Sequence, residues 1–287
     1  MKKYFFFLGF ALILLGFFSV VQYVQFHDQN LHLIFCDVGQ GDGIIIRTPS
    51  GKIILVDGGP DEKILDCLSR HTPFWERTIT LMLLSHPHAD HLNGLISVVD
   101  RYLTKHFVSE KLANNTTGYN TLHEVLMSKQ IPQRNVFLGD SMSMSDGIVL
   151  RILSPTKKLL TETSPNGIIG ESKEFANLIT QLSYKDFTAL LVGDSQAPQV
   201  EAAASLVTSS LDVLQVPHHG SLTGLSEKAL TMLKPKLAVV SVGKNSYGHP
   251  AKYTLELLKN ASIPTRMTIQ EGDIEIISDG KTSELQH

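Results

Sequence analysis

The sequence predicts an α/β sandwich, in which two β-sheets pack face to face with helices outside, preceded by one N-terminal helix that spans a membrane. Two patterns support this fold class. Each half of the chain has several strand-like apolar runs followed by strand–helix units, and residues 4–24 are almost free of polar side chains. The chain has 287 residues, 43 % of them hydrophobic, which suits one large domain or two small ones. We expect a single domain over residues 28–287.

The N-terminal apolar segment runs from Tyr4 to Val24 and follows two lysines. About 20 residues of helix, at about 1.5 Å each, can cross a hydrocarbon core of about 30 Å. Residues 1–27 are therefore expected to form a single-pass anchor. Lys2 and Lys3 should stay in the cytoplasm, which places the domain outside. The alternatives are a buried core helix or a cleaved signal peptide, which would make the protein secreted; the run is long for a signal peptide and no small-x-small site follows it.

The net charge excludes one kind of binding surface. The chain carries a formal charge of −3, and residues 28–287 alone have 23 basic and 28 acidic side chains, a balance of −5. A domain that binds nucleic acid through a broad basic surface is expected to be basic. Local basic patches remain compatible with this composition.

The chain after the anchor begins with three predicted strands, which are Leu31–Cys36, Gly43–Arg47 and Lys52–Val56. A helix is expected to follow over Glu62–Arg70. Asp37 and Asp57 stand at the ends of two of these strands. Each fits a simple turn, since Asp is common there, or a carboxylate that orients a metal-bound imidazole from behind.

The segment 85–91, Ser-His-Pro-His-Ala-Asp-His, is the strongest indication of chemistry. It follows the apolar run Ile79–Leu84, which reads as a buried strand that ends where the polar residues begin. His86 and His88 are two residues apart, so both point to one side of an extended segment. Asp90 and His91 start a predicted helix. The first pair can bind one metal ion while the second pair faces another.

Further strands also end in ligand-type residues. Predicted strands cover Ile148–Leu153, Asn177–Tyr184, Phe187–Val192, Leu211–Val216 and Leu237–Ser241. The last three lead to Gly193-Asp194, to Pro217-His218-His219-Gly220-Ser221 and to Tyr247-Gly248-His249-Pro250. Together with the 85–91 segment, four strands end in His or Asp, which makes a converging site the best interpretation. Between these elements, Thr121–Lys129 is expected to be helical, Thr156–Glu174 to be a surface loop, and His106 and His123 to be ordinary histidines.

The two cysteines, Cys36 and Cys67, could form a disulfide in an exported protein. Cys36 lies on a predicted strand and Cys67 in a predicted amphipathic helix, so two buried free thiols are an equally good interpretation. Neither residue lies in a C-x-x-C arrangement, and neither is assigned any chemistry.

These motifs together resemble the metallo-β-lactamase fold superfamily, and within it the hydrolase domain of ComEC-type DNA-uptake proteins. The resembling stretches cover roughly residues 31–278 and are Asp37–Asp42, Asp57–Gly59, His86–His91, Gly193-Asp194, Val216–Ser221 and Tyr247–Pro250. The His-x-His-x-Asp-His pattern is specific for the superfamily, and the Asp-Val-Gly-Gln-Gly-Asp, Pro-His-His-Gly-Ser and Tyr-Gly-His-Pro stretches for the ComEC-like branch. The resemblance implies an αββα sandwich with two metal ions at one edge of the sheets.

The resemblance also implies a role for each site residue. His86 and His88 would hold the first ion, Asp90 and His91 the second, and Asp194 would bridge both. One histidine of the His218-His219 pair would complete the second site. We favour His219, and since adjacent residues at the end of a strand point in opposite directions, the two are not expected to bind the same ion. The remaining roles are expected from the residues and the reaction: His218 or His249 would give a proton to the leaving group, Asn177 and Ser221 would bind substrate, and Asp37 and Asp57 would lie behind the metal-binding histidines. Many relatives supply a further histidine to the first ion from a Gly-rich turn, and this chain has no histidine in such a turn.

The expected reaction is hydrolysis by a hydroxide that bridges two divalent ions. Nitrogen and oxygen ligands leave Zn, Mn and Fe open, with Zn the default for imidazole-rich sites. A phosphodiester in a nucleic acid or a small molecule is the expected substrate, and the membrane, reached through residues 4–24, is the expected partner; no obligate protein partner is evident. An amide, lactone or thioester hydrolase on the same fold and an inactive surface binding module are the alternatives.

Overall fold

The computed structural model describes residues 2–169 and 176–286, and its main body is a sandwich of two sheets. The first sheet has eight strands, in the spatial order β17 (Ser283–Gln286), β16 (Ile274–Ser278), β1 (Leu31–Phe35), β2 (Ile44–Arg47), β3 (Ile53–Val56), β5 (Leu81–Leu84), β7 (Phe107–Ser109) and β8 (Gln133–Asn135). The second has seven strands, in the order β15 (Thr265–Met267), β14 (Leu237–Val240), β13 (Val213–Gln215), β12 (Phe187–Leu191), β11 (Ile179–Tyr184), β10 (Ile148–Ser154) and β9 (Ser141–Ser143). A short separate pair joins β4 (Thr78–Ile79) to β6 (Leu103–Thr104).

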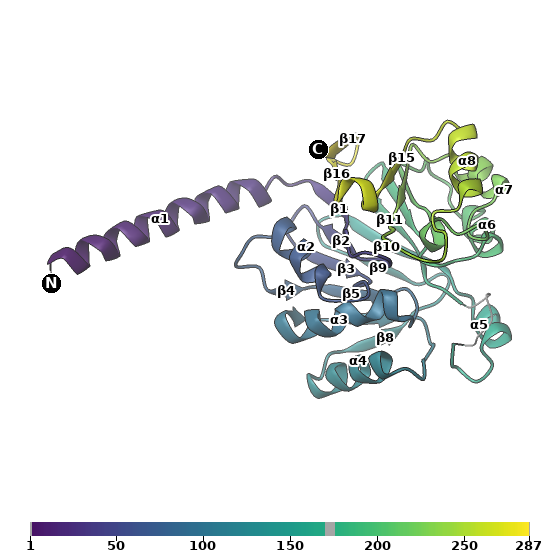
Figure 1. The fold of residues 1–287 in the computed structure, drawn as a ribbon, viewed down its shortest axis with the longest axis horizontal. Coiled ribbons are helices and arrows are strands. Elements are labelled where there is room, and N and C mark those ends of the chain that lie inside the picture. The colour runs from purple at the N-terminus through teal and green to yellow at the C-terminus, as the bar shows by residue number, and fades with distance from the viewer. Residues whose placement is uncertain (1, 170–175, 287) are drawn as a thin grey trace.

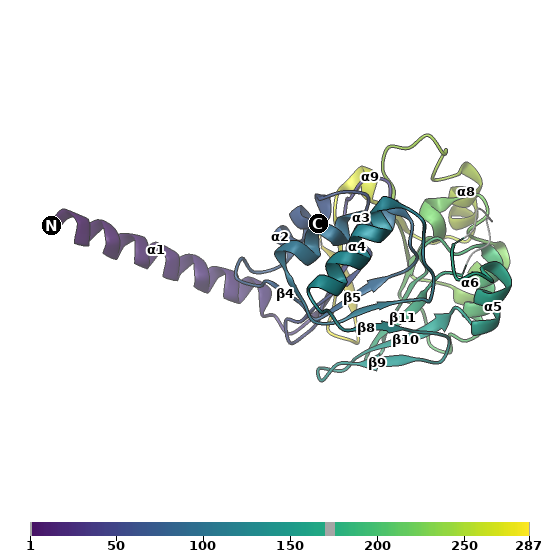
Figure 2. The same cartoon turned by 90° about the horizontal axis from the view of Figure 1, so that it is seen from below.

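Helices cover both outer faces of the sandwich (Figure 1). On one side lie α2 (Lys63–His71), α3 (Ala89–Arg101) and α4 (Thr117–Ser128); on the other lie α6 (Ala197–Ala204), α7 (Glu227–Leu233) and α8 (Lys252–Asn260). Two shorter helices are α5 (Lys157–Thr163) and α9 (Thr268–Glu271). The long helix α1 (Lys2–Phe26) projects away from the sandwich in both views (Figures 1 and 2). The expected αββα architecture is confirmed.

The side-chain alternation of the strands explains the layers. In β1, Leu33 and Phe35 belong to the core between the two sheets, whereas Ile34 belongs to the core beneath α2–α4. In β12, Ala189 and Leu191 face the central core and Leu190 packs with the α6–α8 layer. Because successive side chains of a strand point to opposite faces, strands covered on both faces are apolar at nearly every position.

Some expected elements have different bounds in the structure, and some short strands were not expected. The predicted loop Thr156–Glu174 contains α5, whose first turn is capped by the Thr156 hydroxyl accepting from Leu159 N; its last residues, 170–174, lie outside the described part. The predicted helix Thr121–Lys129 begins earlier, because Thr116 caps it through Tyr119 N. The short strands β7, β8 and β15 were not predicted, since runs of three residues carry little periodicity.

Helix α1 contains a stretch from Phe7 to Phe26 whose length and apolar composition suit a membrane span, with a mean hydropathy of 2.2; apart from the buried Phe26, its residues are exposed or partly exposed. Four residues then lead into β1. The end of the helix is fixed to the domain, since Arg47 Nη1 donates to Phe26 O at 2.7 Å and the guanidinium lies 5.2 Å from the Phe26 ring. The division into an anchor, 1–27, and a domain, 28–287, stays a prediction.

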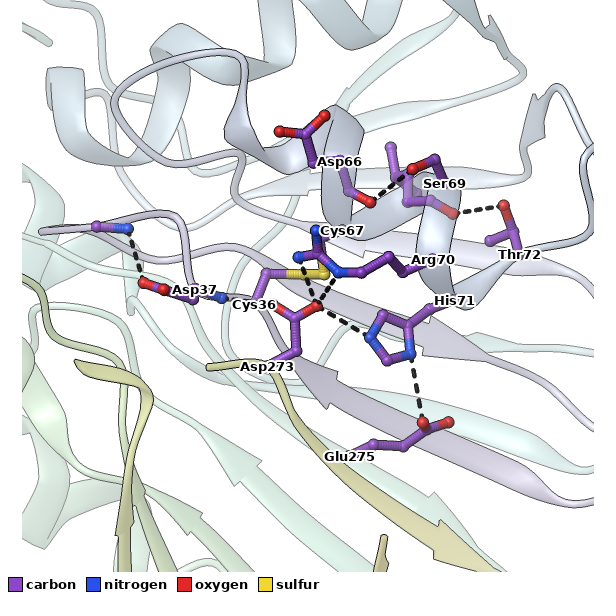
Figure 3. Close-up of a disulfide and its surroundings, with 12 residues drawn as sticks. Cys36, Asp37, Asp66, Cys67, Ser69, Arg70, His71, Thr72, Asp273 and Glu275 are labelled. Atoms are coloured by element: carbon purple, nitrogen blue, oxygen red, sulfur yellow. Dashed lines mark hydrogen bonds and ion pairs between the residues drawn. A yellow bond between two sulfur atoms is a disulfide. The ribbon is translucent and has the colours of Figure 1, made fainter. Parts of the chain in front are cut away.

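Cys36 and Cys67 form a disulfide, so the first of the two alternatives for the cysteines is the correct one (Figure 3). It joins the end of β1 to α2 with Cα atoms 5.9 Å apart and a sequence separation of 31 residues. Closing a loop of that length in the unfolded chain is expected to contribute roughly 3–4 kcal/mol to stability. The bond thereby ties a strand of the first sheet to the helix α2 that packs on its outer face.

Candidate metal centre

The candidate metal centre lies at one edge of both sheets, where parallel strands end. In the first sheet β3 and β5 are parallel, so Asp57 and the 85–91 segment follow neighbouring carboxyl ends. In the second sheet β12 and β13 are parallel, so Asp194 and the turn Pro217–Gly220 follow neighbouring ends too. Carboxyl ends of parallel strands meet at one edge, which is where open α/β sheets bind ligands. Segments distant in sequence therefore converge here.

Of the groups of side chains at this edge whose donor atoms could hold a metal ion, two contain Asp194. Beside Asp194, the first group contains His86 and His88, and the second contains Asp90, His91 and His219. Within each group the potential ligand atoms lie within 4.8 Å of one another. All six residues that were expected to bind metal are therefore brought together, in the two sets that the resemblance implies.

The two oxygens of Asp194 face different histidines. Oδ1 lies 3.3 Å from Nε2 of His91 and 3.3 Å from Nε2 of His219. Oδ2 lies 3.8 Å from Nε2 of His86. Asp90 Oδ2 completes the second group, 3.5 Å from His219 Nε2 and 4.0 Å from His91 Nε2. One carboxylate thus stands between two separate sets of imidazole nitrogens.

The polar atoms at the centre of the second group fit a bound cation. Nε2 of His91, Nε2 of His219 and Oδ1 of Asp194 are all buried, and none makes a hydrogen bond with any residue that the structure describes. Buried polar atoms are almost always hydrogen-bonded, because an unsatisfied one costs about 1–3 kcal/mol. Converging nitrogen and oxygen atoms without hydrogen bonds are the arrangement that a divalent ion satisfies.

Electrostatics in the metal-free state lead to the same conclusion. Burial disfavours charge on His91, but the carboxylates of Asp194 and Asp57 outweigh burial and raise the pKa of His91 well above its ordinary value. Burial likewise opposes ionisation of Asp194, and His219 and His91 outweigh it, so the pKa of Asp194 lies well below its usual range. The cluster is built around negative charge that requires positive charge beside it.

Asp57 fixes the 85–91 segment through contacts with Ser85 and His91 on the side away from Asp194. Its Oδ2 lies 2.8 Å from Nδ1 of His91 and accepts from the Ser85 hydroxyl at 2.6 Å, and its Oδ1 accepts from Ser85 N at 2.7 Å. Ser85 Oγ is also 3.0 Å from Nδ1 of His86. A carboxylate on Nδ1 fixes the ring orientation and leaves Nε2 for a metal. This geometry is the one expected for Asp57.

Asp42, rather than Asp37, provides the second buried carboxylate. Asp37 is exposed, and within the described residues its carboxylate accepts a long bond from Gly39 N at 3.4 Å, so the turn alternative fits this residue and the carboxylate behind a metal-bound imidazole does not. Asp42 is buried, with Oδ1 3.6 Å from Nδ1 of His219 and Oδ2 accepting from Gln215 Nε2 at 2.7 Å. Burial raises its pKa to about 6, although His219 and His91 lower it. Asp37 was singled out because it directly follows a strand. Asp42 is five residues further on, so its position in the sequence did not indicate that it lies at the site.

His218 and His219 lie in a left-handed turn and not in an extended strand. Their φ values are 51° and 54°, a region that residues other than glycine rarely occupy. Such strain persists where the surrounding structure fixes it and is common at functional sites. His219 Nδ1 is 2.9 Å from Ser241 O, which directs Nε2 to Asp194 Oδ1. His218 Nε2 lies 3.4 Å from the other oxygen, Oδ2.

Gln196 determines which nitrogen of His218 carries its proton. The Gln196 amide nitrogen is 3.5 Å from the backbone oxygen of Asp194, which can only accept, so this atom is a donor. The same nitrogen is 3.1 Å from Nδ1 of His218 and donates to it. Neutral His218 therefore carries its proton on Nε2, the atom that faces the centre. Gln196 lies in no motif and was missed from the sequence.

The other expected site residues lie further from the ions' positions. His249 is half-buried, with its ring centroid 5.4 Å from that of His218 and 6.5 Å from that of His219. The Ser221 hydroxyl pairs with Thr223 Oγ1 at 3.3 Å and accepts from Thr223 N at 3.5 Å. Ser221 thus stabilises its own turn, which differs from the substrate contact expected of it.

Asn177 is fully buried beneath the turn that carries Asp194. A Cβ atom built at Gly193 would lie 2.8 Å from Asn177 Oδ1, and Ser85 borders the same position. Neither side-chain amide atom of Asn177 has a hydrogen-bond partner in the described part of the chain. The expected contact with substrate is not supported, because no part of the side chain reaches the surface.

Glu110 is a buried acid at the same sheet edge that the sequence did not reveal. It follows β7, which is parallel to β5. Neither of its carboxylate oxygens has a hydrogen-bond partner in another described residue, and burial raises its pKa well above the ordinary value. Glu110 lines a cavity of about 320 Å³ together with Leu84, Tyr119 and Leu122. The cavity lies beside the metal centre, beneath α4.

Comparison with solved structures identifies the fold. YhfI of Bacillus subtilis, a metallo-β-lactamase fold protein, superposes with a TM-score of 0.57 at 10 % identity, over 85 % of this chain and 99 % of its own. This chain has the metallo-β-lactamase fold. Zinc-bound PqqB of Methylobacterium extorquens (TM-score 0.51, 14 % identity, 79 % and 85 % covered) and the diiron β-hydroxylase CmlA of Streptomyces venezuelae (0.54, 15 %, 87 % and 54 %) are also similar. These two carry different metals, so the fold alone does not select the ion.

Two curated proteins resemble the sequence, and both are ComEC-type competence proteins. ComE operon protein 3 of Bacillus subtilis is 24 % identical over 260 residues, which is 83 % of this chain and 32 % of that protein. Recombination protein 2 of Haemophilus influenzae is 25 % identical over 277 residues, 93 % of this chain and 31 % of that protein. The chain thus spans about a third of the length of each. No family model matches the sequence.

Proposed function

We propose that this protein is a membrane-anchored, extracytoplasmic, metal-dependent phosphodiesterase with two divalent ions, zinc or manganese. The observation that carries the proposal is the position of Asp194, whose two oxygens face two separate sets of imidazoles. Two ions so held supply an activated water and an electrostatic clamp for the non-bridging oxygens of a phosphodiester. His86 and His88 would hold one ion, Asp90, His91 and His219 the other, and Asp194 both.

The residues around the ions have distinct parts in this proposal. Asp57 occupies Nδ1 of His91, and the backbone oxygen of Ser241 occupies Nδ1 of His219 with the Asp42 carboxylate close by, so that Nε2 of each ring is directed inward. His218, whose Nε2–H faces the centre, is placed to donate a hydrogen bond to the departing oxygen and so to stabilise the developing alkoxide. His249, whose ring lies beside that of His218, borders the same space without facing Asp194 directly.

The location outside the cytoplasm has two supports. The Phe7–Phe26 stretch of α1 is long and apolar enough to span a bilayer, and Lys2 and Lys3 precede it. The Cys36–Cys67 disulfide is of the kind that persists in oxidising compartments and is rare in the cytosol. A single-pass anchor with the domain outside accounts for both features.

A substrate panel tests the proposed reaction. The full chain is purified in detergent, loaded with Zn²⁺ or Mn²⁺, and assayed on bis-p-nitrophenyl phosphate, single-stranded DNA and nitrocefin. We expect hydrolysis of the first, with DNA cleavage showing whether the site admits a polymer, and none of nitrocefin. Turnover of nitrocefin alone would favour an amide hydrolase. Tight metal binding with no turnover of any substrate would favour a binding module.

A further inference from the structure

The edge of the domain opposite the metal centre carries an exposed apolar loop. The loop Thr72–Arg77 precedes β4 and β5, whereas the metal centre follows β5. Thr80, just before β5, donates from N to Ile53 O at the start of β3, which confirms that this end of the strands is the far one. Phe74 and Trp75 are 50 % and 41 % exposed, and their rings meet edge to face at 4.9 Å.

This loop touches α1 within the segment that suits a membrane span. Gln22 Oε1 accepts from Phe74 N at 3.2 Å. Trp75 lines a surface pocket together with Ser19, Val20 and Tyr23. All four helix residues fall in the last two turns of the Phe7–Phe26 stretch. If those turns lie in the outer boundary of a bilayer, the loop that contacts them lies there as well.

The surroundings of the loop match the chemistry of that boundary. Leu103, whose N donates to Arg77 O, is 65 % exposed on the neighbouring strand β6. Arg77 and Lys105 are exposed at the same end, and the one acidic side chain of the loop, Glu76, is engaged by Thr78 N. Tryptophan and other aromatic residues favour the membrane interface, and exposed cations attract anionic lipid headgroups.

We propose that Phe74 and Trp75 insert into the outer membrane interface beside α1 and fix the domain with its metal centre directed away from the bilayer. This inference depends on the proposed membrane anchoring. The helix is held to the domain at Phe26 by Arg47, and only four residues separate α1 from β1, so the domain has little freedom to turn over. The strands of the first sheet run from the edge with the apolar loop to the edge with the metal centre. Four or five residues of strand, at about 3.3 Å each, separate these two edges by about 15 Å, and the loops at both ends add to this distance.

The orientation narrows the substrate class. Phospholipid headgroups are themselves phosphodiesters and are abundant at an anchored enzyme's own membrane. With the metal centre on the far edge, the phospholipids of that bilayer cannot reach the Asp194 cluster. The substrate is therefore a phosphodiester that arrives from outside, in a polymer or a soluble molecule.

The single tryptophan of the chain makes a direct test possible, because all tryptophan emission comes from Trp75. The full chain is reconstituted in phosphatidylcholine–phosphatidylglycerol vesicles, with or without bromine on the upper acyl chain, and vesicle flotation is measured first. We expect co-flotation, blue-shifted emission, at least twofold quenching by the brominated lipid, and weak quenching by aqueous acrylamide. Flotation with strong acrylamide quenching and no bromine quenching would overturn the contact alone. Failure to float would overturn the anchor and the contact together.

Relocated tryptophans test the orientation. In a Trp75→Phe background, Phe17→Trp places the probe within α1 and should be quenched by bromine, which calibrates the measurement. Tyr247→Trp places it at the metal-centre edge, where Tyr247 is 75 % exposed. We expect acrylamide quenching and no bromine quenching for that variant. Bromine quenching of the Tyr247→Trp probe would show that the metal centre faces the membrane and would overturn the proposed orientation.

Discussion

The domain has two clusters of histidines and carboxylates, one at the candidate metal centre and one along β1 and β16, and they differ in how their polar atoms are satisfied. In the β1–β16 cluster (His32, His71, Asp273 and Glu275), His71 Nε2 lies 3.0 Å from Asp273 Oδ2, and His32 Nδ1 lies 2.6 Å from Glu275 Oε1. Arg70 also donates to the same Asp273 oxygen, at 2.6 Å (Figure 3). At the candidate metal centre, Nε2 of His91, Nε2 of His219 and Oδ1 of Asp194 have no hydrogen bond within the described residues.

The difference separates a structural cluster from a candidate metal centre. Histidines and carboxylates in proximity do not by themselves indicate a metal, because they can neutralise one another. The β1–β16 cluster does so: burial opposes charge on His71, but Asp273 and Glu275 outweigh it and raise its pKa to about 9. A metal centre instead leaves several buried donor atoms pointing at one another and unpaired.

The largest expected effect is that of Asp194→Ala, which should remove most of both metal ions and essentially all turnover. One carboxylate faces both ligand groups and offsets charge that would otherwise repel across the site. His88→Ala should retain more metal, since His88 belongs to one group. Elemental analysis of the purified variants measures this. Asp273→Ala is the matched control from the other cluster; equal metal loss in it and in Asp194→Ala would contradict the distinction between the two clusters.

The next effect is that of His218→Ala, which should keep both ions and lose turnover on an alkyl phosphodiester by on the order of 10²–10³-fold, because the Nε2–H donor to the departing oxygen is lost. A p-nitrophenyl ester should lose less, because its leaving group carries its negative charge without such a donor. His219→Ala should instead lower metal occupancy. Similar losses on both esters in His218→Ala would leave His218 a binding or structural residue, and metal loss in His218→Ala alone would reverse the assignment of the pair.

The β1–β16 cluster should make the free energy of unfolding depend on pH, through the ionisation of His71. Since the pKa of His71 is raised from 6.5 to about 9, its contribution is complete below pH 6.5 and is lost as the pH rises to about 9. That loss is on the order of 3 kcal/mol. The pKa values of Asp273 and Glu275, which burial raises but their histidine partners lower further, are about 2, so their contribution is lost only in acid.

The measurement is the free energy of unfolding between pH 6 and pH 9.5 for the wild type and for His71→Gln. We expect the alkaline decline to flatten in His71→Gln, while His106→Gln, at an exposed histidine, behaves as the wild type does. An unchanged alkaline decline in His71→Gln would show that this cluster does not carry the effect. Metal content should be unaffected throughout.

The smallest expected effect is that of Gln196→Ala. Without the donor to its Nδ1, the His218 ring can rotate and can carry its proton on either nitrogen. We expect about a 10-fold loss in kcat on an alkyl phosphodiester, which is the lower limit of the usual effect of removing a residue that orients an active-site group. Metal content should be unchanged. The p-nitrophenyl ester should be nearly insensitive. A uniform loss on both substrates would indicate a packing defect and not a positioning role.

The sequence alone determined the fold class, the anchor candidate and the six candidate metal ligands that the structure brings together. It could do so because these features are local: a 20-residue apolar run, buried strands of four to six residues, and ligand residues directly at strand ends. Asp57 was found for the same reason. The equal alternatives for Cys36 and Cys67 stayed open, since pairing depends on where a strand and a helix meet in space.

The tertiary structure decided what depends on the direction of a side chain. Asp42 replaces Asp37 because a turn of five residues returns the chain to the centre, and Asn177 and Ser221 turn out to be enclosed. The His218-His219 pair separates through a left-handed turn, and not through the alternation of a strand on which the expectation rested. Gln196 and Glu110 carry no pattern at all. Their significance comes only from burial and from atoms more than twenty residues away, which a local pattern cannot encode.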